Sequence, residues 1–129
     1  MSLQNSKLVK YTKNTYIFSD RIYINFSDDS RLEGMYLIQV PRHCKKTLIV
    51  NAKKKISIFR LIMSKNIDKF SKWQKTNIKV EIQGYSGTHD TVITKKFPAG
   101  KIILANYEWV FAPVLIETES PNNISFHFE

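Results

Sequence analysis

Residues 56–63 read ISIFRLIM, and this stretch decides the fold. Apolar residues occupy both of its alternating faces, and only Ser57 and Arg60 are polar. A strand that is apolar on both faces is covered on both sides, so we expect a central strand here. Arg60 is the exception within the run. It should either be paired or mark the point where the strand leaves the core.

Shorter segments on both sides of this stretch alternate apolar and polar residues, a pattern typical of half-buried strands. We expect strands over residues 15–19, 22–26, 35–40, 46–51, 78–83, 91–97, 101–106, 109–118 and 124–128. Pro113 should bend its strand or place it at a sheet edge, because proline has no N–H to donate. Residues 1–13 are polar and basic, and are expected to form a flexible arm or an edge strand.

One segment, residues 64–75, has helical spacing. Ile67, Phe70 and Trp73 recur every third residue and would form a narrow apolar stripe. Ser64 or Asn66 could cap the start of this helix. The sequence therefore predicts a mainly β protein: an antiparallel β-sandwich, with a jelly roll or a barrel as variants, and one short amphipathic helix near 64–75. We expect one β-rich domain over 1–129.

The apolar member of each alternating strand should be buried, because one face of such a strand packs on the core. The residues expected in the core are Ile24, Ile38, Ile58, Val80, Ile82, Leu104 and Phe126.

Positive charge is concentrated in the first two thirds of the 129-residue chain, whose formal net charge is +9. Up to residue 80 there are 17 basic and five acidic residues, against three basic and six acidic residues in 81–129. Such an asymmetry suggests a surface that faces a polyanion. The basic residues are densest between 42 and 79, where aromatic residues that could stack on bases also occur.

We therefore expect a non-enzymatic domain that binds nucleic acid or another polyanion. The residues expected to bind it are Arg42, Lys45, Lys46, Lys53, Lys54, Lys55, Lys65, Lys69, Lys72, Trp73 and Lys75. The small arginine count argues against base-specific readout, in which arginine predominates. Two alternatives remain open: lysines that only solvate the surface and block edge pairing, and an interaction module for an acidic protein partner. Small basic β-domains are frequent among viral structural and accessory proteins, so self-assembly into a homo-oligomer is also expected.

Other functions have weaker support. Segment 64–75 could lie on an anionic membrane, but its apolar stripe is only three residues wide. The histidines and the single cysteine lack metal-ligand spacing, so no cofactor is expected. A hydrolase would have to use His89 with nearby carboxylates, and no convergent set of titratable groups supports it. Glu117 and Glu119 would share one strand face, a spacing that alternation alone produces.

The chain is expected to be intracellular, cytoplasmic or nuclear, and not secreted. Its single cysteine, Cys44, allows no intramolecular disulfide, and no apolar signal segment opens the sequence. The longest apolar run, residues 110–116, is far shorter than the ~20 residues that a bilayer-spanning helix needs, so no transmembrane segment is expected.

Overall fold

The computed structural model describes residues 6–12, 15–19, 21–24, 30–84, 87–106 and 111–129, with backbone only for 21–24, 30, 81–84 and 87–88. Within these residues the chain forms eleven strands and three short 3₁₀ helices. In chain order they are β1 (Lys7–Lys10), β2 (Tyr16–Phe18), β3 (Arg21–Ile24), η1 (Ser30–Leu32), β4 (Tyr36–Gln39), β5 (Leu48–Ala52), β6 (Ile56–Ile62), η2 (Ser64–Phe70), β7 (Gln74–Gly84), β8 (Gly87–Phe97), β9 (Gly100–Leu104), β10 (Val114–Glu117), η3 (Pro121–Asn123) and β11 (Ile124–Phe128).

The strands form two main sheets. A six-stranded sheet has the order β1-β4-β10-β6-β8-β7, and a three-stranded sheet has the order β11-β5-β9. All pairings within both sheets are antiparallel, and β2 and β3 form a separate two-stranded ribbon. The predicted mainly β, sandwich-like fold is confirmed, and the described strands form no closed barrel. β1 pairs with β4 at the edge of the six-stranded sheet. Of the two structures expected for the N-terminal segment, a flexible arm or an edge strand, residues 7–10 form the edge strand.

β6 is the central strand that the sequence predicts. It pairs with β10 on one side and β8 on the other, and Ile58 and Leu61 are fully buried. Arg60 stays in the core at 1% exposure, where its guanidinium donates hydrogen bonds to the carbonyls of Ala105 and Ala112. A buried charge needs such partners, because an unsatisfied polar group in the interior is costly.

The predicted core is largely confirmed. Ile38, Ile58, Val80 and Leu104 are all buried. Phe126 is only half-buried, although its ring packs against the main core cluster. Its strand, β11, lies at the edge of the three-stranded sheet, where fewer neighbours cover a side chain. The side chains of the other two predicted core residues, Ile24 and Ile82, lie outside the described part.

The predicted helix is shorter and tighter than expected. It is the 3₁₀ helix η2, which ends at Phe70, and β7 begins at Gln74. The recurrence of apolar residues at every third position suits 3.0 residues per turn better than 3.6. Neither Ser64 nor Asn66 caps it: Met63 is the N-cap residue and makes no side-chain capping bond. The N–H of Ser64 is bound instead by the Asp90 carboxylate of β8, at 3.2 Å.

The strand predicted over 109–118 was also too long. β10 starts at Val114, directly after Pro113, which has no N–H for a ladder. Residues 107–110 lie outside the described part. The carbonyl of Pro113 still accepts a hydrogen bond from the N–H of Leu61, at 3.2 Å. The proline thus contacts β6 while the regular strand begins one residue later.

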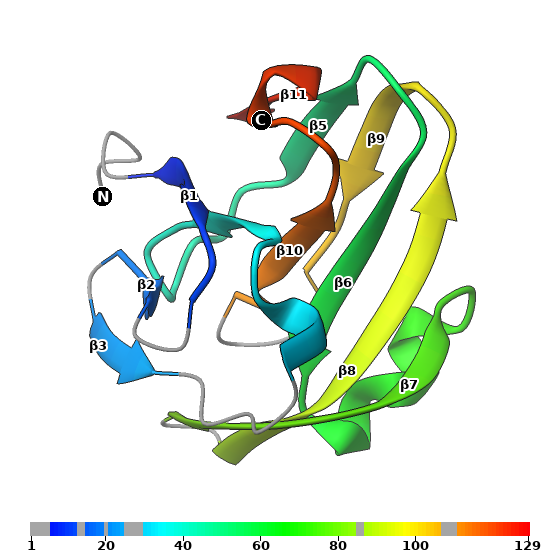
Figure 1. Ribbon diagram of the computed structural model, residues 1–129. Coiled ribbons are helices and arrows are strands. Elements are labelled where there is room, and N and C mark those ends of the chain that lie inside the picture. Colours follow the sequence, from blue (N-terminus) through cyan, green and yellow to red (C-terminus); the bar gives the residue numbers. More distant parts are fainter. Residues whose placement is uncertain (1–5, 13–14, 20, 25–29, 85–86, 107–110) are drawn as a thin grey trace.

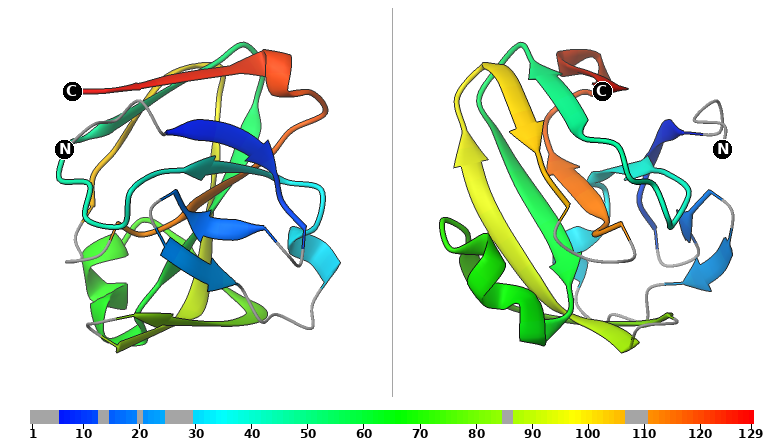
Figure 2. Two further views of the ribbon diagram at one scale, coloured as in Figure 1. Left: turned by 90° about the vertical axis from the view of Figure 1, so that its left-hand side faces the viewer. Right: turned by 180° about the vertical axis from the view of Figure 1, so that it is seen from behind.

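Three connections between the sheets lie at the same end of the molecule. They join β5 to β6, β8 to β9, and β10 to β11, at the top of Figure 1. η2 follows the opposite end of β6, and both views in Figure 2 keep it at the end away from these connections. We call the end with the three connections the junction end, and the other the η2 end.

Candidate functional site

The predicted lysines do not gather on one surface. Lys53, Lys54 and Lys55 form the β5–β6 connection at the junction end, and all three are exposed. The second group lies in and after η2, at the far end of β6 (Figure 1). Its members are Lys65, Lys69, Lys72 and Lys75, all exposed. Seven residues of extended strand separate the two groups, a distance of about 20 Å at the usual rise per residue.

The remaining predicted residues lie elsewhere. Arg42 is in the interior, 6% exposed, so it does not belong to the exposed basic surface. Lys45 and Lys46 are exposed on the connection that enters β5. Trp73 is half-buried and packs against both core clusters. Its role in the fold is therefore structural at least in part.

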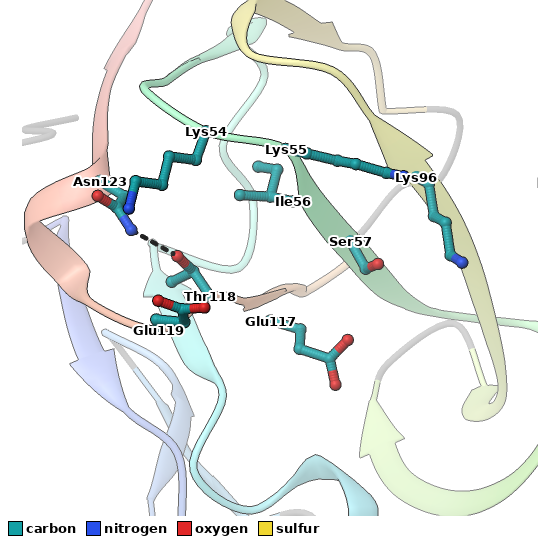
Figure 3. A pocket seen from close by; sticks show the side chains of 9 residues that line it. All are labelled: Lys54, Lys55, Ile56, Ser57, Lys96, Glu117, Thr118, Glu119 and Asn123. Carbon is teal, nitrogen blue, oxygen red and sulfur yellow. Dashed lines mark hydrogen bonds between the residues drawn. The ribbon is translucent and has the colours of Figure 1, made fainter.

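A pocket of about 490 Å³ opens at the junction end, and we call it the junction pocket (Figure 3). It is lined by Lys54, Lys55, Ile56, Ser57, Lys96, Glu117, Thr118, Glu119 and Asn123. Its volume is in the range of small-molecule sites, about 300–1,000 Å³. The lining comes from three segments far apart in the sequence: the start of β6, the end of β8 and the β10–β11 connection.

Strand register forms the floor of the junction pocket. Glu117 of β10 pairs with Ser57 of β6, which pairs with Lys96 of β8. Directly paired residues point to the same face of a sheet, with Cβ atoms about 5 Å apart. An acid, a hydroxyl and a base therefore lie in one row across three strands, and register alone brings the 57, 96 and 117 positions together.

The rim of the junction pocket is held by hydrogen bonds from the β10–β11 connection. The Asn123 side chain donates to the Thr118 hydroxyl, at 3.3 Å (Figure 3). The carbonyl of Asn123 accepts from the N–H of Lys53, at 2.8 Å, which ties the lysine connection to η3. Ser120 in turn caps η3 by accepting from the N–H of Asn122. The β5–β6 connection, which carries Lys54, is thus fixed against η3.

Charge in the junction pocket is mixed but predominantly positive. Lys54 extends toward Asn123, and Lys55 extends toward the strand that carries Lys96 (Figure 3). Two carboxylates, Glu117 and Glu119, occupy the other part of the lining. Ammonium groups bind phosphate as compact point charges, while the carboxylates repel it. An anion would therefore be directed to the lysine ammonium groups and away from the two carboxylates.

Several lining residues could not be found from composition. Lys96 lies in the third of the chain with net negative charge, which hid it. Glu117 and Glu119 do not share a strand face as expected: β10 ends at Glu117, and Glu119 lies in the bend before η3. They line the same pocket because the chain turns there. Lys96 could have been placed beside Ser57 only by assuming that the predicted strands 56–63 and 91–97 pair in an antiparallel manner, as β6 and β8 do.

The η2 end presents its lysines differently. Asn66 and Phe70 are the buried residues of η2, and the lysines lie on its outer side. The N–H of Trp73 donates to the carbonyl of Phe70, at 2.9 Å, which closes the turn after the helix. The Trp73 ring meets Phe97 edge-on, with centroids 5.8 Å apart. The predicted stripe therefore faces the core.

The described residues give no added support to a metal site, a hydrolase or a membrane-bound protein. Among the described residues, no group of three or more His, Cys, Asp or Glu side chains could hold a metal ion. His89 is buried at 1% exposure, whereas the neighbouring Asp90 is exposed and binds the start of η2. Within the described part of the chain, no helix is long and apolar enough to cross a membrane.

Comparison with known proteins adds no relative. A scan against family models, a search of curated proteins and a search of solved structures each found no match. A functional argument therefore has to start from the pockets and charges of this chain.

Proposed function

We propose that the protein binds a nucleic acid backbone, or a polyanion of the same chemistry, at the junction end. One observation carries this proposal: lysines from two segments far apart in the sequence line one pocket, with Lys54 and Lys55 from the β5–β6 connection and Lys96 from β8. Three lysines stand against two carboxylates in this lining, so one positive charge is left without a counter-charge from the pocket itself. A phosphate-bearing ligand supplies that counter-charge.

The charge of the whole chain and of the pocket's surroundings supports the same proposal. A net charge of +9 attracts polyanions over distances longer than any single contact. Lys53 adds a further exposed ammonium beside the pocket. Glu117 and Glu119 occupy part of the lining and repel an anion there, which favours a ligand that runs along the lysines of the rim over one that fills the whole pocket.

The test is a titration with single- and double-stranded RNA and DNA across a series of salt concentrations. Backbone binding predicts an affinity that falls linearly with salt on a log–log plot. Replacing Lys54, Lys55 and Lys96 together by Gln should flatten that slope by up to about three units, one for each phosphate that a lysine no longer neutralises.

A matched control removes the same charge from the η2 end. The variant Lys65→Gln, Lys69→Gln, Lys72→Gln lowers the net charge equally, so the proposal expects its slope to stay close to that of the wild type. An equal loss in both variants would assign binding to general charge and contradict the junction site. No binding at low salt would rule out the nucleic acid ligand, and an acidic protein partner would then be the better account.

A further inference from the structure

A second, smaller pocket lies on the other side of β8 from the junction pocket, and we call it the aromatic pocket. Its volume is about 130 Å³, and the residues that define it are Arg60, Phe70, Trp73, Lys95, Phe97 and Ile103. Three aromatic rings and two cations thus share one small hollow. The side chain of Ile103 is 64% exposed, which is unusual for a large apolar residue beside such a hollow.

The rings and cations of the aromatic pocket contact one another. The guanidinium carbon of Arg60 lies 5.6 Å from the centroid of the Phe70 ring, and the Lys95 ammonium lies 5.2 Å from that of Phe97. The rings of Trp73 and Phe97 meet at an interplanar angle of 63°.

Arg60 is buried at 1% exposure, and its guanidinium carbon also lies 5.5 Å from the centroid of the Phe111 ring, so it supports the pocket from inside. The half-buried Trp73, Lys95 and Phe97 are the groups that a ligand can reach. They suit a flat π-system, which can stack on or meet an aromatic ring edge-on and approach a cation through its face.

Size restricts what the aromatic pocket can hold. An engineered cavity of about 150 Å³ is known to accept benzene. The aromatic pocket, at about 130 Å³, is slightly smaller than that cavity, so one six-membered ring can enter it more fully than two fused rings can. A pyrimidine base is therefore a better fit than a purine.

The two pockets are adjacent around one edge of β8. Lys95 and Lys96 follow each other in this strand, so their side chains point to opposite faces of the sheet. Among the described strands, β7 covers this side of β8 only as far as Thr94, which pairs with Gln74. Residues 95–97 therefore form an open sheet edge between the pockets. A flexible single strand could pass over this edge and contact both lysines.

We propose that the aromatic pocket binds a pyrimidine base of a single-stranded nucleic acid whose phosphates contact the lysines at the junction end. This inference rests on the proposed function and adds the ligand class: single-stranded and pyrimidine-rich. An acidic peptide suits the pocket less well: a carboxylate could pair with Lys95, but it gains nothing from the rings of Trp73 and Phe97. Base stacking on aromatic side chains, in contrast, adds about 1–3 kcal/mol per base.

The test compares three oligonucleotides of equal length and phosphate number: oligo-dT, oligo-dA and an abasic strand. Binding is followed by fluorescence anisotropy of a labelled strand at fixed salt. Oligo-dT should bind about 5-fold to 150-fold more tightly than the abasic strand, the range that one stacked base gives. Oligo-dA should bind less tightly than oligo-dT, because a purine enters the pocket less fully.

A pair of phenylalanine variants tests the pocket itself. Phe97→Leu removes a ring from the pocket and keeps an apolar side chain of similar size, so the preference for oligo-dT over the abasic strand should shrink toward one. Phe126→Leu is the matched control, since Phe126 is also half-buried but does not line the pocket. It should keep the preference. Thermal unfolding of both variants checks that each is folded at the temperature of the assay.

Each contrary outcome has a distinct meaning. Equal binding of oligo-dT and the abasic strand would overturn the base pocket and leave the proposed backbone binding standing. Tighter binding of oligo-dA than oligo-dT would overturn the preference for a single ring. If both Phe97→Leu and Phe126→Leu lost the preference for oligo-dT, the loss would be a consequence of general destabilisation and not of the pocket. No binding of any strand at low salt would overturn both proposals, and displacement of oligo-dT by an equally charged poly-glutamate peptide would replace the base with an acidic partner.

Discussion

The junction end and the η2 end carry similar numbers of lysines but are built differently. At the junction end, residues from three distant segments line one pocket, and its rim is held by hydrogen bonds from η3. At the η2 end, the lysines come from one local segment and lie outside a 3₁₀ helix whose buried residues face the core. Density of charge along the sequence thus does not distinguish a binding site from a solvated helix face. We place the proposed site at the junction end because separate segments line one pocket there.

The largest expected effect concerns the structural role of the η2 end. Phe70 is 3% exposed and joins Ile62 and Ile93 in a core cluster. Phe70→Ala should lower the free energy of unfolding by about 3–5 kcal/mol, because it leaves a cavity. Urea unfolding measures this loss. Lys54→Ala at the junction end is the contrasting variant, with an expected change within about 0.5 kcal/mol. Similar losses in the two variants would contradict the structural role assigned to Phe70.

A slightly smaller loss is expected in the strand that joins the two ends. Ile58 of β6 is fully buried, and Ile58→Ala should cost about 2–5 kcal/mol. Ile103→Ala makes the same chemical change at a side chain that is 64% exposed, so its cost should stay near 0.5 kcal/mol or below. Chemical denaturation of the two variants gives the comparison, and a cost for Ile58 no greater than for Ile103 would show that the β6 register is wrong.

The acidic part of the junction pocket gives an effect of opposite sign. Glu117→Gln or Glu119→Gln removes a charge that repels phosphate, so each should strengthen oligonucleotide binding, by at most about 1 kcal/mol for a pair near 4 Å in water. Asp68→Asn makes the same kind of change in η2 and should leave affinity unaltered. The measurement is the anisotropy titration at low salt. Weaker binding in the glutamate variants would mean that these carboxylates contact the ligand directly.

The smallest effect lies at the C-terminal end of β11, outside both lysine groups. The hydrogen bond from the His127 ring, with a further contribution from the charge of Lys101, lowers the pKa of the Glu129 carboxyl. A carboxyl with a depressed pKa in the folded state stabilises the fold above its unfolded pKa, and this is lost as pH falls through the folded pKa. Because Glu129 is fully exposed, the change in stability should be slight.

An NMR titration of the Glu129 carboxyl checks this last prediction. In His127→Gln the imidazole is absent, so the Glu129 pKa should rise toward its ordinary value. High salt should produce a smaller rise in the wild type, because screening weakens the contribution of Lys101 and leaves the hydrogen bond in place. An unchanged pKa in the variant would mean that the hydrogen bond is not formed in solution.

Residue pattern alone predicted the fold class and four of the buried core residues, Ile38, Ile58, Val80 and Leu104. Alternation with a period of two identified β4, β5, β9 and β11 close to their observed bounds, because a half-buried strand must direct every second side chain inward. β8 begins four residues earlier than its predicted start at residue 91. The doubly apolar run at 56–63 identified the central strand β6, because a strand covered on both sides is apolar on both faces. At 64–75 and 109–118 the predicted helix and strand are present but shorter, because three-residue periodicity gave a 3₁₀ helix and Pro113 delayed the start of β10.

Only the tertiary structure decided where the charges meet. Local pattern contains no information on which strands are neighbours, so Lys96, Glu117 and Glu119 could not be associated with Lys54 and Lys55 beforehand. Pairing of β6 with both β8 and β10 placed Ser57, Lys96 and Glu117 in one row, and seven residues of the same strand separated the two lysine groups. Burial likewise moved Arg42 and Arg60 inside, because the packing around a side chain, and not its type, sets its exposure.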